Sequence, residues 1–104
     1  MNITLKTRRA LYGEPIFAAC EAPDGVCGAA AREQRTQLVK DVHEFAGHIA
    51  CDAATNSELV IPLTIGDQRL GVLDLDSPKL ARFSATDQAI LEQLATKIAT
   101  MIAN

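Results

Sequence analysis

Several classes of protein are excluded by what this sequence lacks. No apolar run approaches the roughly 20 residues of a membrane-spanning helix, and no apolar stretch follows the basic start MNITLKTRR, so we expect no membrane association and no secretory signal. A content of 48% hydrophobic and 22% charged residues is unlike that of disordered tails, collagen-like repeats or coiled coils. We therefore expect one cytoplasmic domain over residues 1–104, large enough to bury a core without metals or disulfides.

Cysteine is also scarce, with three residues at Cys20, Cys27 and Cys51. An odd number without an export signal argues against a structural disulfide framework. Cysteines that cluster in a reducing compartment more often bind metal or perform redox chemistry. The alternative is that each cysteine is a small buried apolar residue.

Basic residues are few in the middle of the chain. Residues 41–76 carry Arg69 against seven acidic residues, a net charge of −6, whereas residues 1–40 have a net charge of +2. A surface that neutralises phosphates needs the opposite balance, so we expect no nucleic-acid partner. A small cationic group is a better candidate ligand, and an acidic face that only contacts solvent is the alternative.

The C-terminal half has the clearest structural pattern. Leu59–Ile65 and Gln68–Asp76 are apolar-rich runs joined by two residues, which predicts an antiparallel hairpin. An N-cap at Ser84, with Asp87 three positions on, then opens an amphipathic helix that we expect to pack on the sheet. Upstream, the pattern weakly predicts strands over 16–20 and 36–39 and a short helix over 29–34.

Hairpin geometry predicts which side chains share a face. With the turn at Gly66 and Asp67, Leu63 should face Leu70, Ile61 should face Val72 and Leu59 should face Asp74. Asp74 and Asp76 then lie on one face, whereas Leu73 and Leu75 point toward the C-terminal helix. A cationic ligand group between the two carboxylates would relieve their repulsion, although the strand could simply end in solvent there.

Two chemistries fit the remaining cysteine and histidine residues. Cys27, His43, His48 and Cys51 could form a tetrahedral zinc site, but their spacing matches no common zinc pattern. The other chemistry is thiol redox, in which Cys27, just before a short helix, gains thiolate character from the helix end. One thiolate would attack a substrate, become a sulfenic acid and be resolved by a second cysteine. For the histidines we favour hydrogen bonds that order the loop over proton transfer.

The stretch GVCGAAAREQRTQLVKDVHEFAGHIACDAATNSELVIPL, followed by GDQRLGVLDLDSP and RFSATD, closely resembles the free methionine-(R)-sulfoxide reductases, which are built on a GAF domain. The resemblance extends from about Gly25 to the C-terminus. GHIACDAATNSE is specific to these enzymes among GAF proteins, whereas GVLDLDS and the terminal helix are shared more widely.

The resemblance implies reduction of the R sulfoxide of free methionine with electrons from thioredoxin, and it implies no cofactor and no metal. Cys51 matches the cysteine usually assigned to attack the sulfoxide sulfur, and Cys27 and Cys20 match the other two family cysteines, one of which closes the disulfide. Glu58 matches an acidic residue that assists protonation of the sulfoxide oxygen.

The predicted substrate pocket combines carboxylates with small residues. Asp74 and Asp76 match pocket carboxylates, which would select the free amino acid by its α-ammonium group. Ala53 and Ala54 are small where a substrate must approach the backbone. Strict pairing puts Glu58 opposite Leu75, on the wrong face, so its role requires that it precede the strand or adjoin a bulge.

The chain departs from the family in two respects. Cys20 and Cys27 are seven residues apart, closer than in the family pattern. The family's first helix, a central strand and aromatic side chains around the substrate are expected to be missing, which would expose a sheet edge; this chain has no Trp and a single Tyr, Tyr12.

We therefore expect an α+β, GAF-like antiparallel sheet with flanking helices, forming a single partial domain over residues 1–104. The predicted function is reduction of free methionine-(R)-sulfoxide, with thioredoxin as a partner and a homodimer left open. The alternatives are a GAF-like module that binds a small ligand or senses oxidants, and then a zinc-binding domain.

Overall fold

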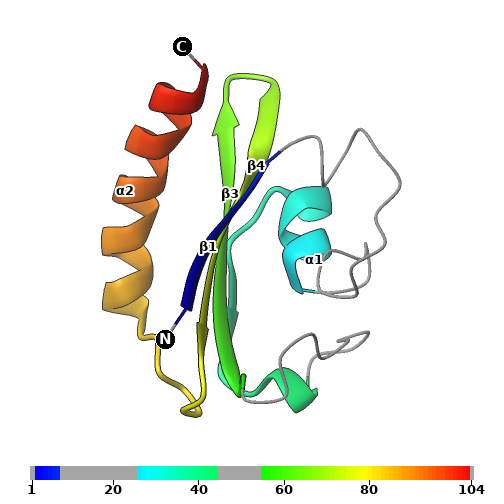
Figure 1. Ribbon diagram of the computed structural model, residues 1–104, viewed down its shortest axis with the longest axis vertical. Helices are drawn as coiled ribbons and strands as arrows, with labels where there is room; N and C mark the ends of the chain where they lie inside the picture. Colours follow the sequence, from blue (N-terminus) through cyan, green and yellow to red (C-terminus); the bar gives the residue numbers. More distant parts are fainter. Residues whose placement is uncertain (1, 8–25, 45–54, 104) are drawn as a thin grey trace.

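The computed structural model describes residues 2–7, 26–44 and 55–103, which form one antiparallel sheet with a helix on each face (Figure 1). The sheet order is β1-β4-β3-β2. This architecture confirms the predicted α+β class. The elements are β1 (Asn2–Thr7), α1 (Val26–Glu33), β2 (Gln37–Val39), the short 3-10 helix η3 (Val42–Glu44), β3 (Ser57–Ile65), β4 (Gln68–Ser77) and α2 (Ala85–Ala103).

The predicted hairpin is confirmed as β3 and β4, but its predicted register is wrong. Gly66, at φ 57°, allows the tight turn, and Ile65 pairs with Gln68 as expected. The register then shifts between Leu63 and Thr64, so that Leu63 pairs with Gly71 rather than Leu70. The extra residue in β4 is a β-bulge, which moves every later pair by one position.

Because of the bulge, the remaining pairs of the hairpin differ from the predicted ones. Ile61 faces Leu73 instead of Val72, and Leu59 faces Leu75 instead of Asp74. The same shift brings Glu58 opposite Asp76, so Glu58 shares a face with the aspartates. The sequence analysis allowed a bulge as one way to place Glu58 there, and the structure contains one.

The sheet face toward α2 holds the larger core. Leu59 and Leu75 are buried in it, and the small residues Ala95 and Ala99 of α2 let the helix approach the strands closely. The predicted orientation of Leu73 and Leu75 toward the C-terminal helix is therefore confirmed. The buried members of this core are Leu59, Ile61, Leu63, Leu73, Leu75, Phe83, Ala95 and Ala99.

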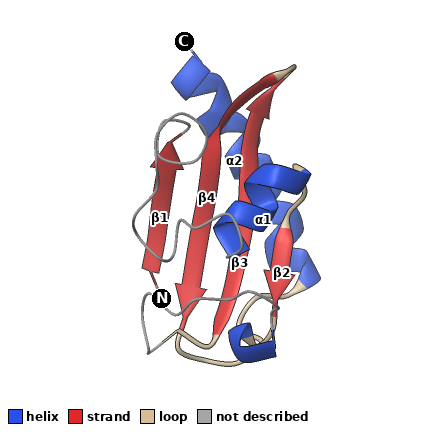
Figure 2. Cartoon of the chain, turned by 90° about the vertical axis from the view of Figure 1, so that its right-hand side faces the viewer, coloured by secondary structure: helices blue, strands red, loops and turns tan. Residues whose placement is uncertain are grey.

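The opposite face is covered by α1, which packs mainly on β3 and β4 and lies in front of β3 in Figure 2. This helix is rich in alanine, and Ala30 and Ala31 are buried against Val60 and Val72 of the sheet. It begins at Val26, three residues before the predicted start at Ala29. Cys27 therefore lies inside its first turn, not before it.

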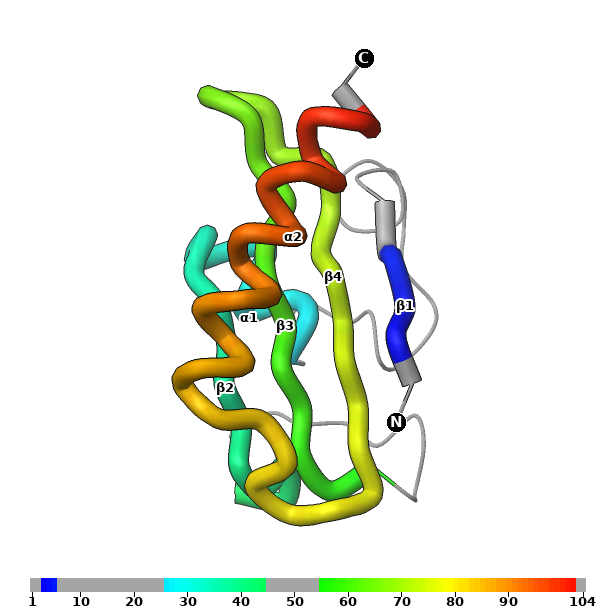
Figure 3. The backbone as a smooth tube through the Cα atoms, turned by 90° about the vertical axis from the view of Figure 1, so that its left-hand side faces the viewer, coloured from blue at the N-terminus to red at the C-terminus, as the bar shows by residue number. Residues whose placement is uncertain are grey.

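The two outer strands differ in how well the sequence predicted them. The strand expected over 36–39 is confirmed as β2, which pairs with the start of β3, Val39 facing Glu58. β1 was not predicted. It pairs with β4 along Asn2–Thr7 and so covers the edge of β4, whereas we expected the sheet to have an exposed edge. In Figure 3 β1 lies to the right of β4, at the edge of the sheet and outside the part that α2 crosses. Its Ile3 side chain is 61% exposed. The strand expected over 16–20 lies outside the described residues.

Within the described part of the chain, no helix is both long and apolar enough to cross a membrane. The longest, α2, packs Ala95 and Ala99 against the sheet and leaves Ile90, Leu94, Met101 and Ile102 exposed. Only part of its apolar spacing is therefore used for packing on the sheet.

The predicted capping of α2 is confirmed and has a pH dependence. The Ser84 amide donates to Asp87 Oδ2 over 2.9 Å, and the Asp87 amide donates to Ser84 Oγ over 3.1 Å. The backbone and hydroxyl hydrogen bonds from Ser84 hold the pKa of Asp87 below its ordinary value. A lowered carboxyl pKa stabilises the fold above the ordinary aspartate range, and this contribution is lost as the pH falls through the pKa of the folded state.

Replacing Ser84 by Ala should lower the free energy of unfolding by about 1 kcal/mol at neutral pH, because the Asp87 amide loses its hydroxyl acceptor. Urea unfolding at pH 7 and at pH 3 measures the effect. The difference between wild type and Asp87→Asn should shrink toward pH 3. A difference that stays constant across that range contradicts the role given to the ionised carboxylate. Thr86→Ala, exposed in the same turn, is the matched control.

Candidate functional site

The thiol of Cys27 lies against two carboxylates at the α1 face of the sheet. Its Sγ is 3.4 Å from Asp74 Oδ2 and 3.9 Å from Glu58 Oε2. All three side chains are buried, with exposed fractions of 1% for Cys27, 6% for Glu58 and 4% for Asp74. We call these three residues the thiol–carboxylate cluster.

Each member of the cluster comes from a different element, so the fold positions them rather than local sequence. Cys27 is in the first turn of α1, Glu58 is near the start of β3 and Asp74 is near the end of β4. Register places Asp76 directly across from Glu58, and Asp74 across from Val60. The two aspartates and Glu58 therefore line one face, as the hairpin geometry predicted for the first two.

Burying this group of acidic side chains costs free energy unless a positive charge or hydrogen bonds compensate for the lost solvent. Val26, Ala30, Val60 and Val72 pack around Cys27, so part of the solvent that would screen the carboxylates is replaced by apolar groups. Two carboxylates and a thiol in contact favour binding of a positively charged group. The arrangement suits recognition of an ammonium group or a metal ion.

Among the described residues, the group able to hold a metal is the thiol–carboxylate cluster, whose ligand atoms lie within 4.8 Å of one another. His43 is not part of it. Its Nε2 donates to Asn56 Oδ1 over 3.0 Å, and the Asn56 amide in turn donates to the Pro78 carbonyl. His43 thus makes a hydrogen bond of the kind that the loop-ordering prediction requires, and that role stays a prediction. Among the described residues, His43 does not join Cys27 in a metal-binding group.

Several predicted site residues lie outside the described part of the chain. They include the proposed attacking cysteine and the small residues expected near the substrate. They are Cys20, His48, Cys51, Ala53 and Ala54. Their roles remain predictions.

The contact between Cys27 and Asp74 is the site feature that the sequence analysis missed. The two residues are 47 positions apart, and no pattern along the chain links them. The face of Glu58 was also mispredicted, although a signal existed. Gly71, at φ 154°, interrupts an otherwise apolar strand next to the register shift, and a glycine inside a strand often marks a bulge.

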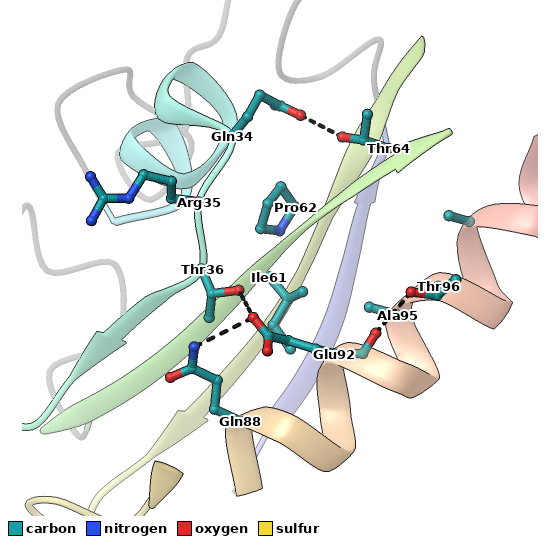
Figure 4. Close-up of a pocket in the computed structure, with 11 residues that line it drawn as sticks. Gln34, Arg35, Thr36, Ile61, Pro62, Thr64, Gln88, Glu92, Ala95 and Thr96 are labelled. Atoms are coloured by element: carbon teal, nitrogen blue, oxygen red, sulfur yellow. Dashed lines mark hydrogen bonds between the residues drawn. The ribbon is translucent and has the colours of Figure 1, made fainter. Parts of the chain in front are cut away.

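A separate cavity of about 500 Å³ lies between α2 and the edge of β3 (Figure 4). In it, Thr36 Oγ1 donates to Glu92 Oε2 over 2.6 Å and Gln88 Nε2 donates to the same oxygen over 3.4 Å. Ile61 forms part of its apolar floor. Because these bonds join α2 to the segment before β2, we interpret the group as a structural tie.

Replacing Glu92 by Ala should lower the free energy of unfolding by about 1.5 kcal/mol, since a charge-assisted hydrogen bond at a half-buried site is lost. Thermal or urea unfolding measures the change. Gln93→Ala, exposed on the same helix, should stay within about 0.5 kcal/mol of wild type. Combining Glu92→Ala with Thr36→Val tests the tie directly, because additive losses would show that the two side chains are not coupled.

Comparisons with known proteins agree with this architecture. The family model of the GAF domain matches residues 6–103. The chain is 48% identical over 79 residues to the free methionine-R-sulfoxide reductase of Escherichia coli. The aligned residues make up 76% of this chain and 48% of that protein. The chain is also 47% identical over 75 residues to the Saccharomyces cerevisiae protein of the same name, covering 71% and 42%. The chain thus spans about half the length of these curated relatives.

Solved structures give the same result. The reduced form of fRMsr from Staphylococcus aureus superposes with a TM-score of 0.79 at 37% identity, over 96% of this chain and 70% of that one. The free methionine-R-sulfoxide reductase of Neisseria meningitidis, in complex with its substrate, gives a TM-score of 0.78 at 34% identity, over 96% and 65%. The chain therefore belongs to the GAF domain family, among the relatives named free methionine-R-sulfoxide reductase.

Proposed function

We propose that this chain reduces the R sulfoxide of free methionine. The observation that carries the proposal is the thiol–carboxylate cluster, in which a thiol and two carboxylates are buried together. The named activity of the E. coli and yeast relatives supports the same chemistry. Thioredoxin is proposed as the reductant.

Asp74 is proposed to bind the α-ammonium group of the substrate, together with Asp76. A buried carboxylate pairs strongly with a cation when it reaches hydrogen-bond distance. A methionine sulfoxide inside a polypeptide has no such ammonium group. The pair would therefore select the free amino acid over oxidised proteins.

The proposed reaction begins at Cys51. Its thiolate attacks the sulfoxide sulfur while the oxygen is protonated, with Glu58 as the proposed proton donor. The protonated oxygen is then transferred from the substrate sulfur to the Cys51 sulfur: the S–O bond of the sulfoxide breaks, methionine leaves, and Cys51 becomes a sulfenic acid, so that the sulfoxide is reduced and the cysteine is oxidised. A second thiol then attacks the Cys51 sulfur, water leaves and a disulfide forms.

We assign the second thiol to Cys27 rather than to Cys20. Cys27 lies beside Glu58 and Asp74, and either carboxylate is placed to accept the thiol proton as the disulfide forms. A dithiol of thioredoxin would then reduce the Cys27–Cys51 disulfide and restore both thiols.

The test is a coupled assay in which thioredoxin and its reductase oxidise NADPH only if substrate is turned over. The expected result is consumption of the R but not the S isomer of free methionine sulfoxide, with Cys51→Ser as the blank. Lack of turnover with thioredoxin, and also with dithiothreitol, would reject the proposal.

A second candidate is a module that binds a small ligand or senses oxidants. It is favoured by one observation, the 53% identity over 69% of this chain to a solved structure from Burkholderia vietnamiensis that is described as a GAF sensor protein. Such a module would be stabilised thermally by methionine or its sulfoxide without turning either over.

A further inference from the structure

We propose that the thiol–carboxylate cluster of Cys27, Glu58 and Asp74 binds a thiophilic divalent cation such as Zn²⁺, and that the ion excludes substrate from the site. The binding of the ion is argued from the cluster alone. The exclusion of substrate rests on the proposed function, in which the same carboxylates hold an ammonium group.

The distances within the cluster are close to the edges of a tetrahedral zinc site. With Zn–S near about 2.3 Å and Zn–O near about 2.0 Å, a tetrahedron has S···O edges of about 3.5 Å. Cys27 Sγ lies 3.4 Å from Asp74 Oδ2 and 3.9 Å from Glu58 Oε2. An ion would therefore change the two S···O distances by only a few tenths of an ångström, while the two carboxylate oxygens, which lie within 4.8 Å of each other, would close to about 3.3 Å.

The ligand types favour a thiophilic ion over the common hard cations. A single thiolate with two carboxylates suits Zn²⁺ or Co²⁺, whereas Mg²⁺ and Ca²⁺ take oxygen ligands. Three protein ligands leave a fourth position for water. Asp76, across from Glu58, is the nearest further carboxylate in the register and is a candidate for that position or for a hydrogen bond to the water.

The backbone holds the three ligands firmly. Glu58 and Asp74 belong to the central, paired strands, and α1 packs Cys27 against them through Val60 and Val72. Little ordering is then needed when the ion binds, which favours affinity. Apolar packing around the cluster also strengthens attraction between the ion and its anionic ligands.

Charge explains why ion and substrate should exclude one another. Binding releases the thiol proton of Cys27 and joins two carboxylates and a thiolate to one divalent ion. An ammonium group at Asp74 would then meet a carboxylate already bound to metal.

The first experiment titrates the reduced full-length chain with Co²⁺ alone and records absorption. We expect one equivalent to give thiolate-to-cobalt charge-transfer absorption and the strong visible bands of a tetrahedral ion, both removed by Zn²⁺. Cys27→Ala should abolish the charge transfer, while Cys20→Ala and Cys51→Ala should each keep it. Charge transfer that survives Cys27→Ala or disappears with Cys51→Ala would overturn the assignment.

The carboxylates are tested by variants of matched shape. Asp74→Asn and Glu58→Gln should each weaken Co²⁺ binding at least about tenfold, whereas Asp67→Asn in the exposed turn should leave it unchanged. Circular dichroism confirms that each variant is folded. Equal Co²⁺ affinity in Asp74→Asn and Asp67→Asn would overturn the cluster as the binding site.

A second experiment addresses exclusion of substrate. Zn²⁺ should raise KM for free methionine sulfoxide without lowering kcat, and a chelator should reverse the effect. Inhibition of kcat at constant KM would overturn the exclusion. Because cobalt binding is measured without substrate, a chain that binds Co²⁺ but lacks turnover supports the metal site and rejects the proposed function, whereas turnover without cobalt binding does the reverse.

Discussion

Asp74→Asn is expected to lower kcat/KM for free methionine-(R)-sulfoxide at least about a hundredfold. The substitution keeps the shape of a side chain that is 4% exposed and removes its charge. Losing one partner of a buried charge pair costs about 2–5 kcal/mol, and about 2.7 kcal/mol corresponds to a hundredfold change. The loss should appear mainly in KM if the ammonium contact is the same in the ground state and the transition state.

Steady-state assays with thioredoxin or dithiothreitol as reductant measure this effect. Asp67→Asn, an identical chemical change in the exposed β3–β4 turn, is the control and should retain wild-type kcat/KM. N-acetylmethionine sulfoxide, which lacks the ammonium group, separates recognition from general damage. Wild type should discriminate strongly against it, and Asp74→Asn should discriminate much less. Equal discrimination by both proteins would remove Asp74 from ammonium recognition.

The features that the sequence predicted well are governed by local rules. The Ser84–Asp87 cap and the apolar spacing after it define the start of α2, and the two-residue connection at Gly66 joins β3 to β4. The alternation along β4 also placed Asp74 and Asp76 on the same face. This face follows from side-chain direction within one strand, which does not depend on the pairing register.

The features that the sequence did not predict depend on contacts between distant segments. One extra residue next to Gly71 changes the cross-strand partners of β3 from Leu63 back to Ser57, so the face of Glu58 could not be derived from turn length alone. The position of Cys27 beside Asp74 needs α1 to pack across the sheet, and β1 needs β4 as a partner before Asn2–Thr7 has a reason to be extended. Neither is encoded in a local pattern.

Leu59→Ala is expected to lower the free energy of unfolding by about 3 kcal/mol, within the 2–5 kcal/mol typical of leucine truncation in a core. Leu59 is 0% exposed and faces Leu75 at the centre of the α2-side core. Domains of this size have total stabilities of about 5–15 kcal/mol, so the loss is a large share.

Urea unfolding measures the loss as a lower midpoint with an unchanged m-value. Leu80→Ala, at a side chain that is 61% exposed, is the control and should change stability by less than about 0.5 kcal/mol. Equal losses in both variants would contradict the placement of Leu59 in the core.

The position of Leu59 means that its substitution should change the stability of the fold without changing the thiol–carboxylate cluster. Leu59 and Glu58 are consecutive residues of one strand, so their side chains point to opposite faces of the sheet. A cavity on the α2 side leaves the thiol–carboxylate cluster on the α1 side intact. Leu59→Ala should therefore keep its Co²⁺ affinity and its kcat/KM at temperatures where it remains folded, while Asp74→Asn should lose both with a much smaller change in unfolding free energy.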